Sequence, residues 1–164
     1  MDIEFTNHDK NWIKKTIWET YSKAAKNPDG LFRYPTGHAG LTALKYDPIY
    51  LQVLPEEVAA SYCGVGNPFT LGPVREGASV LDIGCGAGVD TLLSAMMTGP
   101  SGQVVGIDLT PAMLDRARIN LSKMKLKNVT VVDGSVENLP YSEEDFHIVS
   151  SNGALIVVPD FANA

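Results

Sequence analysis

Three glycines and an aspartate are the residues of this chain whose types and spacing first suggest chemistry. In the stretch VLDIGCGAGVD, residues 80–90, an apolar run containing Asp82 leads directly into Gly84, Gly86 and Gly88. A glycine turn between a strand and a helix lets the backbone approach a ligand and directs helix N–H groups at it. A carboxylate at the strand end accepts from an ammonium group, so the pattern predicts a site for a ligand with an amino-acid head.

Residue type disfavours a dinucleotide loop and excludes a triphosphate loop. A dinucleotide loop has the pattern G-x-G-x-x-G, and Val89 stands where its third glycine would be. A triphosphate loop ends in a lysine, which this stretch lacks. Asp108 ends a second apolar run at the position where a carboxylate can hold both ribose hydroxyls. An amino-acid head and a ribose outline S-adenosylmethionine, although Asp82 and Asp108 could instead cap the turn and the helix that follow them.

Alternating strands and helices must position these residues. We expect strands at residues 79–83, 103–108, 129–132 and 146–150. Helices are expected over residues 89–97 and after Thr110, which precedes a first-turn proline, Pro111. Apolar strands that alternate with amphipathic helices are typical of a parallel sheet covered on both faces. The predicted fold class is therefore α/β, with a partial Rossmann-like sheet of about four parallel strands in residues 73–164.

Residues 1–72 predict an N-terminal helical cap. Thr6 and Asp9 form a capping box that begins the first helix, and the stretch NPDG at residues 27–30 ends it. Two further short helices are expected near residues 41–45 and 55–61, and residues 62–70 are expected to form a loop.

Composition limits the class of partner and the compartment. The chain has 164 residues, a formal net charge of −6 and two cysteines. An acidic surface repels phosphate backbones, so we expect no nucleic-acid partner. The apolar runs are too short to cross a bilayer and the first residues do not resemble a signal peptide, so we expect no membrane association and a cytoplasmic location. The cysteines lack metal-ligand spacing, and we expect no metal site.

Three stretches resemble a known family: VLDIGCGAGVD, VVGIDLTPAMLDRARIN and NVTVVDGSVENLP. They are similar to the first three motif regions of class I S-adenosylmethionine-dependent methyltransferases, over roughly residues 73–158. The resemblance implies that the methionine end of the donor is held by Asp82, Gly84, Gly86 and Gly88. It implies a second set of contacts, with Asp108 at the ribose, Leu109 and Met113 against the adenine, Ser135 and Val136 at the adenine edge, and Ser151 and Asn152 behind the fourth strand. Many family members carry an acidic residue where Ser135 stands, and a serine hydroxyl accepts more weakly.

A narrower resemblance is to the arsenite methyltransferase-like branch. It is carried by the segment CGVGNP before the donor loop and by the phrase IDLTPAML. Members that methylate metalloids place two cysteines where Val65 and Gly153 stand here; Cys63 lies two positions away and Cys85 belongs to the glycine loop. Soft thiolates are the natural ligands of a soft metalloid, so this resemblance implies the fold and the donor and leaves the acceptor open.

Methyl transfer from a sulfonium mainly requires alignment of acceptor, methyl group and sulfur. The catalytic residue is therefore unassigned; His38, Tyr34 and Tyr62 in the cap are candidates, with surface or packing roles as the alternative for each. We expect the acceptor site between the donor loop and the cap, with Tyr21, Tyr34, His38, Tyr62 and residues 63–68 around it. The expected function is S-adenosylmethionine-dependent methyl transfer to a small-molecule acceptor that the cap selects. The alternatives are an S-adenosylmethionine-binding module, an inactive truncated remnant without catalysis, and a nicotinamide-dependent oxidoreductase.

Class I methyltransferases have seven strands, whereas this sequence predicts four, so we expect that the domain is truncated after the fourth strand. The dipeptide Pro159-Asp160 resembles a helix start close to the last residue. In the class I strand order the fourth strand becomes an exposed apolar edge, and such edges pair with other chains. We therefore expect self-association through residues 146–158 if the protein is this short; the alternative is a piece of a longer polypeptide.

Overall fold

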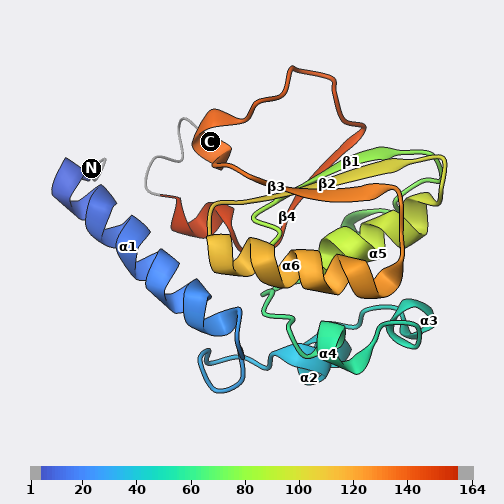
Figure 1. The fold of residues 1–164 in the computed structure, drawn as a ribbon, viewed down its shortest axis with the longest axis horizontal. Coiled ribbons are helices and arrows are strands. Elements are labelled where there is room, and N and C mark those ends of the chain that lie inside the picture. The colour runs from blue at the N-terminus through green and yellow to red at the C-terminus, as the bar shows by residue number, and fades with distance from the viewer. Residues whose placement is uncertain (1–4, 159–164) are drawn as a thin grey trace.

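The sheet has four parallel strands in the order β3-β2-β1-β4. They are seen in a computed structural model that describes residues 5–158 (Figure 1). The strands are β1 (Ser79–Ile83), β2 (Gln103–Asp108), β3 (Val129–Asp133) and β4 (Ile148–Ser151). The α/β fold with four parallel strands is confirmed. The expected helix start at Pro159 lies outside the described residues.

The fourth strand begins two residues later than predicted. His147 precedes β4, and its N–H donates to the Ser79 carbonyl at 3.0 Å. The His147 Nδ1 accepts from the Ser79 N–H at 3.0 Å. These contacts attach the chain to the start of β1 before the regular ladder begins at Ile148, which pairs with Val80.

Two helices cover one face of the sheet. They are α5 (Val89–Thr98), which packs on β1 and β2, and α6 (Pro111–Met124), which packs on β2 and β3; the two helices also contact each other. Two right-handed crossovers that proceed in the same direction across a sheet put both helices on the same face. We expected helices to cover the other face as well. It is covered instead by side chains of the segment between β3 and β4 and of the segment after β4, among them Val136, Leu139, Tyr141, Phe146 and Leu155.

The N-terminal segment is helical, as predicted, and contains one helix that the sequence reading missed. Its helices are α1 (Asn7–Ala24), α2 (Gly37–Ala43), α3 (Pro48–Leu51) and α4 (Glu56–Ala59). The capping box is confirmed, because the Asp9 N–H donates to Thr6 Oγ1 at 3.2 Å and the Thr6 N–H donates to Asp9 Oδ2 at 3.0 Å. The dipeptide Asp47-Pro48 could have revealed α3, because an aspartate before a first-turn proline is typical of a helix start. In the structure Asp47 caps α3 by accepting from the Ile49 N–H at 2.9 Å.

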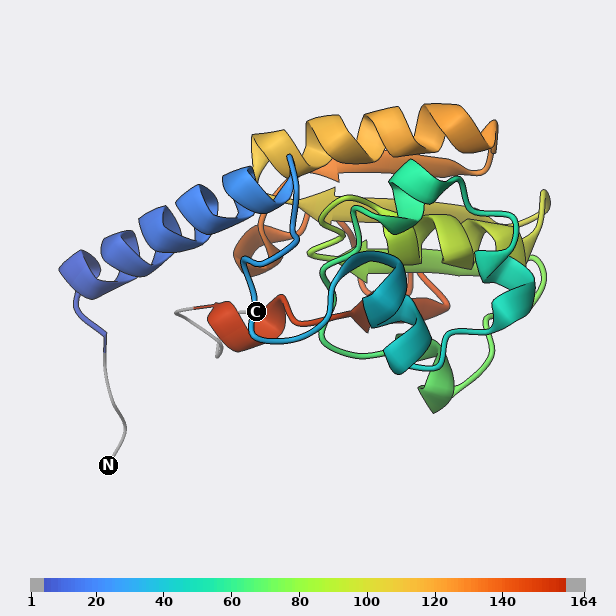
Figure 2. The ribbon, with the colours of Figure 1, turned by 90° about the horizontal axis from the view of Figure 1, so that it is seen from below.

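The N-terminal segment shares a hydrophobic core with α5. Leu41, Tyr46 and Val58 are buried in one cluster with Leu92 and Leu93. In contrast, α1 runs past the body of the molecule, and Ala24 at its end is its buried residue (Figure 2). Among residues 5–158, none of the helices is both long and apolar enough to span a bilayer.

Candidate functional site

A cavity lies at the carboxyl ends of β1 and β2. Its lining includes the glycine loop that follows β1, the end of β2, the turn after β3 and the residues after β4. Residues of α1 and the loop 61–65 complete it from the N-terminal segment. Ligands of open parallel sheets bind at this edge, where neighbouring connections leave in opposite directions. Here α5 leads from β1 to β2, and β4 pairs on the other side of β1.

The glycine loop adopts a conformation that requires glycine. Gly84, Gly86 and Gly88 have φ values of +70°, +53° and +80°, in the left-handed region. A Cβ at Gly84 would also overlap the Cβ of Ala154. We expected the loop amides to face the ligand, but the N–H groups of Gly84 and Cys85 both donate to the Ile107 carbonyl, at 2.7 and 3.0 Å. The loop therefore offers close backbone approach, and these amides secure it to β2.

Asp82 is buried at the end of β1 and lines the cavity. Its carboxylate accepts from Thr91 Oγ1 at 2.6 Å and from Ser150 Oγ at 3.4 Å. Burial, followed by the nearby charge of Asp90, raises the pKa of Asp82 above its ordinary range. Burial likewise raises the pKa of Asp90, which also lines the cavity. The site therefore holds two carboxyl groups whose ionised forms are destabilised by the lack of solvent.

Asp108 at the end of β2 caps the following helix, one of the two roles that were open from the sequence, and it also lines the cavity where the other role would be performed. Its side chain accepts from the Thr110 N–H at 2.8 Å and from the Gly86 N–H at 2.9 Å, and it lines the cavity. Asp108 thus supplies the side-chain bond at the start of α6, because Thr110, which we expected to cap this helix, makes no side-chain cap bond. Burial raises the pKa of Asp108.

The remaining donor-site predictions divide into two groups. Leu109, Ser135, Val136 and Asn152 are on the cavity lining. Met113, Gly88 and Ser151 are not. Met113 is 1% exposed and packs with Ala24, Ala25 and Ala87, because the first turn of α6 faces the end of α1. The hydroxyl of Ser151 is buried and has no hydrogen-bond partner among the described residues.

Of the three candidates for catalysis, only Tyr62 reaches the cavity. His38 is exposed on α2, and its Nδ1 lies 3.4 Å from Thr42 Oγ1. The Tyr34 ring stacks on Phe32, and its hydroxyl donates to the Cys63 carbonyl at 3.0 Å. The Tyr62 hydroxyl donates to the Gly66 carbonyl at 2.7 Å. Burial raises the pKa of Tyr62 above its usual range, so this phenol stays protonated and serves as a hydrogen-bond donor.

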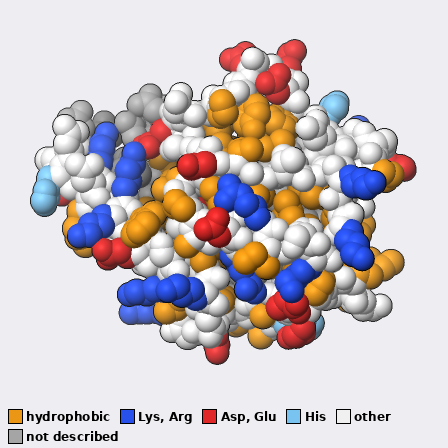
Figure 3. Space-filling model, viewed as in Figure 1, with side chains coloured by type: hydrophobic (Ala, Val, Ile, Leu, Met, Phe, Trp, Pro, Cys, Tyr) orange, Lys and Arg blue, Asp and Glu red, His pale blue; other side chains and the backbone are white. Residues whose placement is uncertain are grey.

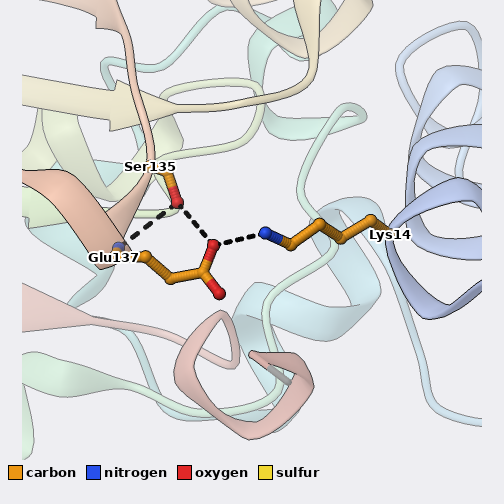
Figure 4. Close-up of polar contacts among 3 residues, drawn as sticks. All are labelled: Lys14, Ser135 and Glu137. Carbon is orange, nitrogen blue, oxygen red and sulfur yellow. Dashed lines mark hydrogen bonds and ion pairs between the residues drawn. The ribbon is translucent and has the colours of Figure 1, made fainter. Parts of the chain in front are cut away.

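Helix α1 contributes to the cavity through Tyr21, which we expected at the acceptor site, and through Lys14 and Ile17, which sequence reasoning missed. Lys14, Ile17 and Tyr21 line it, and their i, i+3, i+7 spacing, which puts them on one helix face, was a readable signal. Figure 4 shows Lys14 reaching across to Glu137, with Nζ and Oε2 2.5 Å apart. The same Oε2 is 3.4 Å from the Ser135 hydroxyl, so a carboxylate stands beside the serine.

Charge is distributed unevenly around the site. On the face shown in Figure 3, lysine and arginine side chains gather over α1 and α6. Within the cavity the charged groups of β1, β2 and α5 are carboxylates, and the ion pairs found among residues 5–158 include none of Asp82, Asp90 and Asp108. In the same part of the chain, no group of three or more His, Cys, Asp or Glu side chains is arranged to hold a metal ion.

The strand order, the glycine turn after β1 and the carboxylate at the end of β2 define an α/β domain that binds a nucleoside cofactor at the carboxyl edge of its sheet. A family model described as a methyltransferase domain matches residues 75–164, more than half of the chain. The chain belongs to this family: it is a class I S-adenosylmethionine-dependent methyltransferase domain, and it is similar to arsenite methyltransferases.

Individual relatives agree with this assignment. An arsenite methyltransferase of Halobacterium salinarum is 39% identical over 97 residues, which cover 59% of this chain and 25% of that protein. A demethylmenaquinone methyltransferase of Lactobacillus johnsonii is 38% identical over 88 residues, covering 53% of this chain and 36% of that protein. The crystal structure of an arsenic(III) S-adenosylmethionine methyltransferase from Chlamydomonas reinhardtii matches with a TM-score of 0.62 at 32% identity, covering 79% of this chain and 43% of that chain. This chain thus spans less than half the length of each.

Proposed function

We propose that this protein binds S-adenosylmethionine in the cavity at the carboxyl ends of β1 and β2 and transfers its methyl group to a small-molecule acceptor. The observation that carries the proposal is the joint lining of one cavity by Asp82, the glycine loop, Asp108 and the Ser135–Val136 turn. These are the elements that the family resemblance assigns to the two ends of the donor. Residues 73–164 supply the donor half, and residues 1–72 select the acceptor.

The chemistry of the cavity fits a cationic ligand. Asp82, Asp90 and Asp108 line it, burial raises the pKa of each, and none takes part in an ion pair found among residues 5–158. A ligand with an ammonium and a sulfonium group supplies the missing positive charge, and it favours the ionised carboxylates. The hydroxyl of Ser151, which is buried without a partner, is a further polar group beside this site.

We assign the donor contacts as follows. Asp82 accepts from the ammonium group of the donor, directly or through water, and Asp108 accepts from the ribose hydroxyls with the lone pairs that its two backbone bonds leave free. Leu109 and Val136 pack on the adenine, and Ser135 accepts from its amino group, with Glu137 alongside. Since Met113, Gly88 and Ser151 lie off the lining, we assign them the support of the loop and strand rather than contact.

The donor brings an activated methyl group, and the chain has to align the acceptor with it and exclude water. Lys14, Ile17 and Tyr21 of α1 and the loop 61–65 enclose the cavity on the side away from the sheet. Burial raises the pKa of the Cys63 thiol to about 12, so this thiol stays neutral at neutral pH. An acceptor that is already nucleophilic needs no base from this site.

The test is calorimetric titration with S-adenosylmethionine and S-adenosylhomocysteine, followed by an assay of methyl transfer. Arsenite and a demethylated menaquinone analogue form the first acceptor panel, because relatives act on compounds that their names give. Binding together with turnover supports the proposal. Binding without turnover on any acceptor supports a donor-binding module, and no binding of either compound refutes the donor site. Enhanced NADH fluorescence on mixing would support the oxidoreductase alternative.

We further propose that, if the protein ends with the sequence given, a second copy of the chain pairs along residues 146–158. In the described part of the sheet β4 pairs with β1 alone, and Val149 and Ile156 are 59% and 78% exposed. Unpaired strand edges with apolar side chains favour pairing with another chain. Sedimentation velocity at tens of micromolar should show a dimer boundary, and a single monomer boundary would reject this interface.

A further inference from the structure

The side-chain amide of Asn152, just after β4, is saturated by contacts with the N-terminal segment and α5. Its Oδ1 accepts from the N–H groups of Val65 at 3.1 Å and Gly66 at 2.9 Å. Its Nδ2 donates to the Gly66 carbonyl and to Asp90 Oδ2, both at 2.8 Å. One amide thus joins the end of the fourth strand, the loop 62–66 and the first turn of α5.

Two buried tyrosines close this junction. The Tyr46 hydroxyl donates to Asp90 Oδ1 at 2.8 Å and lies 3.0 Å from the Tyr62 hydroxyl. Both hydroxyls also lie within hydrogen-bond distance of the Gly66 carbonyl, at 3.0 and 2.7 Å. A Cβ at Gly64 would overlap the Asn152 amide and the Tyr62 hydroxyl. The junction therefore has no room for a side chain at Gly64.

We propose that Asn152 is a positioning residue, which fixes the loop 62–66 as the acceptor-facing wall of the cavity and makes no polar contact with the donor. A side-chain amide has two donor hydrogens and one acceptor oxygen with two lone pairs. The contacts with Val65, Gly66 and Asp90 use all four, so none is left for a ligand. The inference rests on the proposed function and refines the prediction that Asn152 belongs to the donor pocket.

The position of this loop decides what the acceptor meets. Cys63, Gly64 and Val65 line the cavity, and the other end of the loop is held by the bond from the Gly37 N–H to the Tyr62 carbonyl at 2.7 Å. Loss of the Asn152 amide would leave two loop N–H groups unpaired and would remove one donor from the buried Asp90. Val65 is exposed and Gly66 is half-buried, so water can replace their lost bonds once the loop moves outward, whereas the lost donor leaves the buried Asp90 less satisfied. The loop should therefore leave its place while the sheet stays folded.

The two cysteines provide the test. Cys63 lies in the wall that Asn152 is proposed to hold, whereas Cys85 lies in the glycine loop and serves as an internal reference. In the full chain carrying Asn152→Ala, iodoacetamide labelling at pH 8, resolved by peptide mass spectrometry, should accelerate at least tenfold at Cys63 and less than twofold at Cys85. The Kd of S-adenosylhomocysteine should stay within threefold of the wild type. An unchanged Cys63 labelling rate would overturn the proposal. A tenfold loss of affinity for S-adenosylhomocysteine would also overturn it, whatever the Cys63 labelling rate.

Asn128 offers a matched control. Its Nδ2 also donates to two backbone carbonyls, those of Ala95 at 3.0 Å and Gly99 at 2.8 Å, and it is outside the cavity lining. Asn128→Ala should change neither labelling rate by more than twofold. An equal acceleration of Cys63 in both variants would mean that any lost amide loosens the chain, and this would also overturn the proposal.

A second variant decides the matter if Asn152→Ala unfolds and exposes both thiols. In Asn152→Asp, the new carboxyl faces Asp90; the other titratable groups nearby are Asp82 on β1, Tyr46, Tyr62 and Cys63. Its ionised form repels Asp90, and its protonated form restores one donor. The measured quantity is the labelling rate of the variant divided by that of the wild type at the same pH. For Cys63 this ratio should fall at least fivefold from pH 8 to pH 6, and for Cys85 it should stay constant. A Cys63 ratio that does not change with pH would overturn the proposal. Failure of wild-type chain to bind S-adenosylhomocysteine would refute the proposed function alone.

Discussion

The two walls of the cavity are held in place by different means. The wall formed by β1, β2 and the glycine loop is anchored in buried strands, and the amides of Gly84 and Cys85 attach the loop to Ile107. The wall formed by α1 depends on the buried Ala24 near its end and on the ion pair between Lys14 and Glu137, whose side chains are 47% and 21% exposed.

This difference indicates a division of labour. Buried, internally bonded groups keep their geometry whether or not a ligand is present, and such preorganisation favours affinity. An exposed ion pair contributes little and breaks easily. We therefore expect donor affinity to depend mainly on the sheet-side wall, and the rate of donor release to depend on α1.

The largest effect should follow a change in the glycine loop. Gly84→Ala adds a Cβ that overlaps Ala154, at a residue with a φ of +70°. We expect donor affinity to fall at least about a hundredfold and the free energy of unfolding to fall by about 2–5 kcal/mol, the sum of left-handed strain and overpacking. Calorimetric titration and urea unfolding measure the two effects.

Gly30 provides the matched control for this change. Its φ is +71°, and a Cβ there would meet no atom within 4 Å. Gly30→Ala should therefore lose only about 1–2 kcal/mol, the strain of the left-handed conformation, with donor affinity unchanged. Equal losses of stability in the two variants would show that contact with Ala154 does not constrain the loop.

A smaller effect is expected at the end of β2. Asp108→Asn removes the negative charge and leaves one acceptor oxygen for the N–H groups of Gly86 and Thr110. A charge-assisted hydrogen bond is worth about 1.5–3 kcal/mol, so donor affinity should fall about tenfold to a hundredfold. The control is Asp115→Asn on the exposed face of α6, where the carboxylate pairs with Arg118 at 2.9 Å. If both variants bind S-adenosylhomocysteine like the wild type, Asp108 has no role in the donor site.

The buried carboxyl groups predict a pH dependence of stability. Because burial raises the pKa of Asp82 in the folded state, the folded protein binds this proton more tightly than the unfolded chain. The stabilisation is complete below the ordinary pKa of an aspartate, about 3.9, and is lost as the pH rises toward neutrality.

Asp82→Asn should therefore be less sensitive to pH than the wild type. Relative to the wild type, its free energy of unfolding without ligand should rise by an amount on the order of 2 kcal/mol between pH 4.5 and pH 8. Urea unfolding at the two pH values measures the change. Parallel pH profiles for the two proteins would mean that Asp82 titrates normally in the folded state.

The smallest effect should come from the wall formed by α1. An exposed ion pair contributes about 0.2–1 kcal/mol, so Lys14→Ala should accelerate dissociation of S-adenosylhomocysteine about two- to fivefold. The adjacent Lys15 pairs with Glu19 within α1 at 3.9 Å and is outside the cavity lining, and Lys15→Ala should leave the rate unchanged. Stopped-flow displacement measures both rates. If S-adenosylhomocysteine dissociates from the two variants at the same rate, the proposed difference between the two walls is wrong.

The sheet-side wall was predictable from the sequence because its geometry is local. The turn after β1 requires glycine at positive φ, and strand ends in a parallel sheet meet at one edge, so Asp82, Gly84 and Asp108 could be brought together from their spacing. The same reasoning did not anticipate that Met113 lies off the cavity lining, because its burial against Ala24 depends on a helix that begins a hundred residues earlier in the chain. It also did not anticipate that His38 and Tyr34, whose residue types suit chemistry, lie off the cavity lining.

The sequence by itself determined the α/β class and the donor loop, since periodicity and glycine conformation act over short stretches. The strand order was expected only from the family resemblance. Only the tertiary structure decided which of the expected residues of the N-terminal segment face the cavity and which others join them. Lys14 meets Glu137, and Asn152 meets Val65 and Gly66, through contacts between residues far apart in the chain. Such pairs depend on how whole elements pack against each other, which no local pattern of residues records.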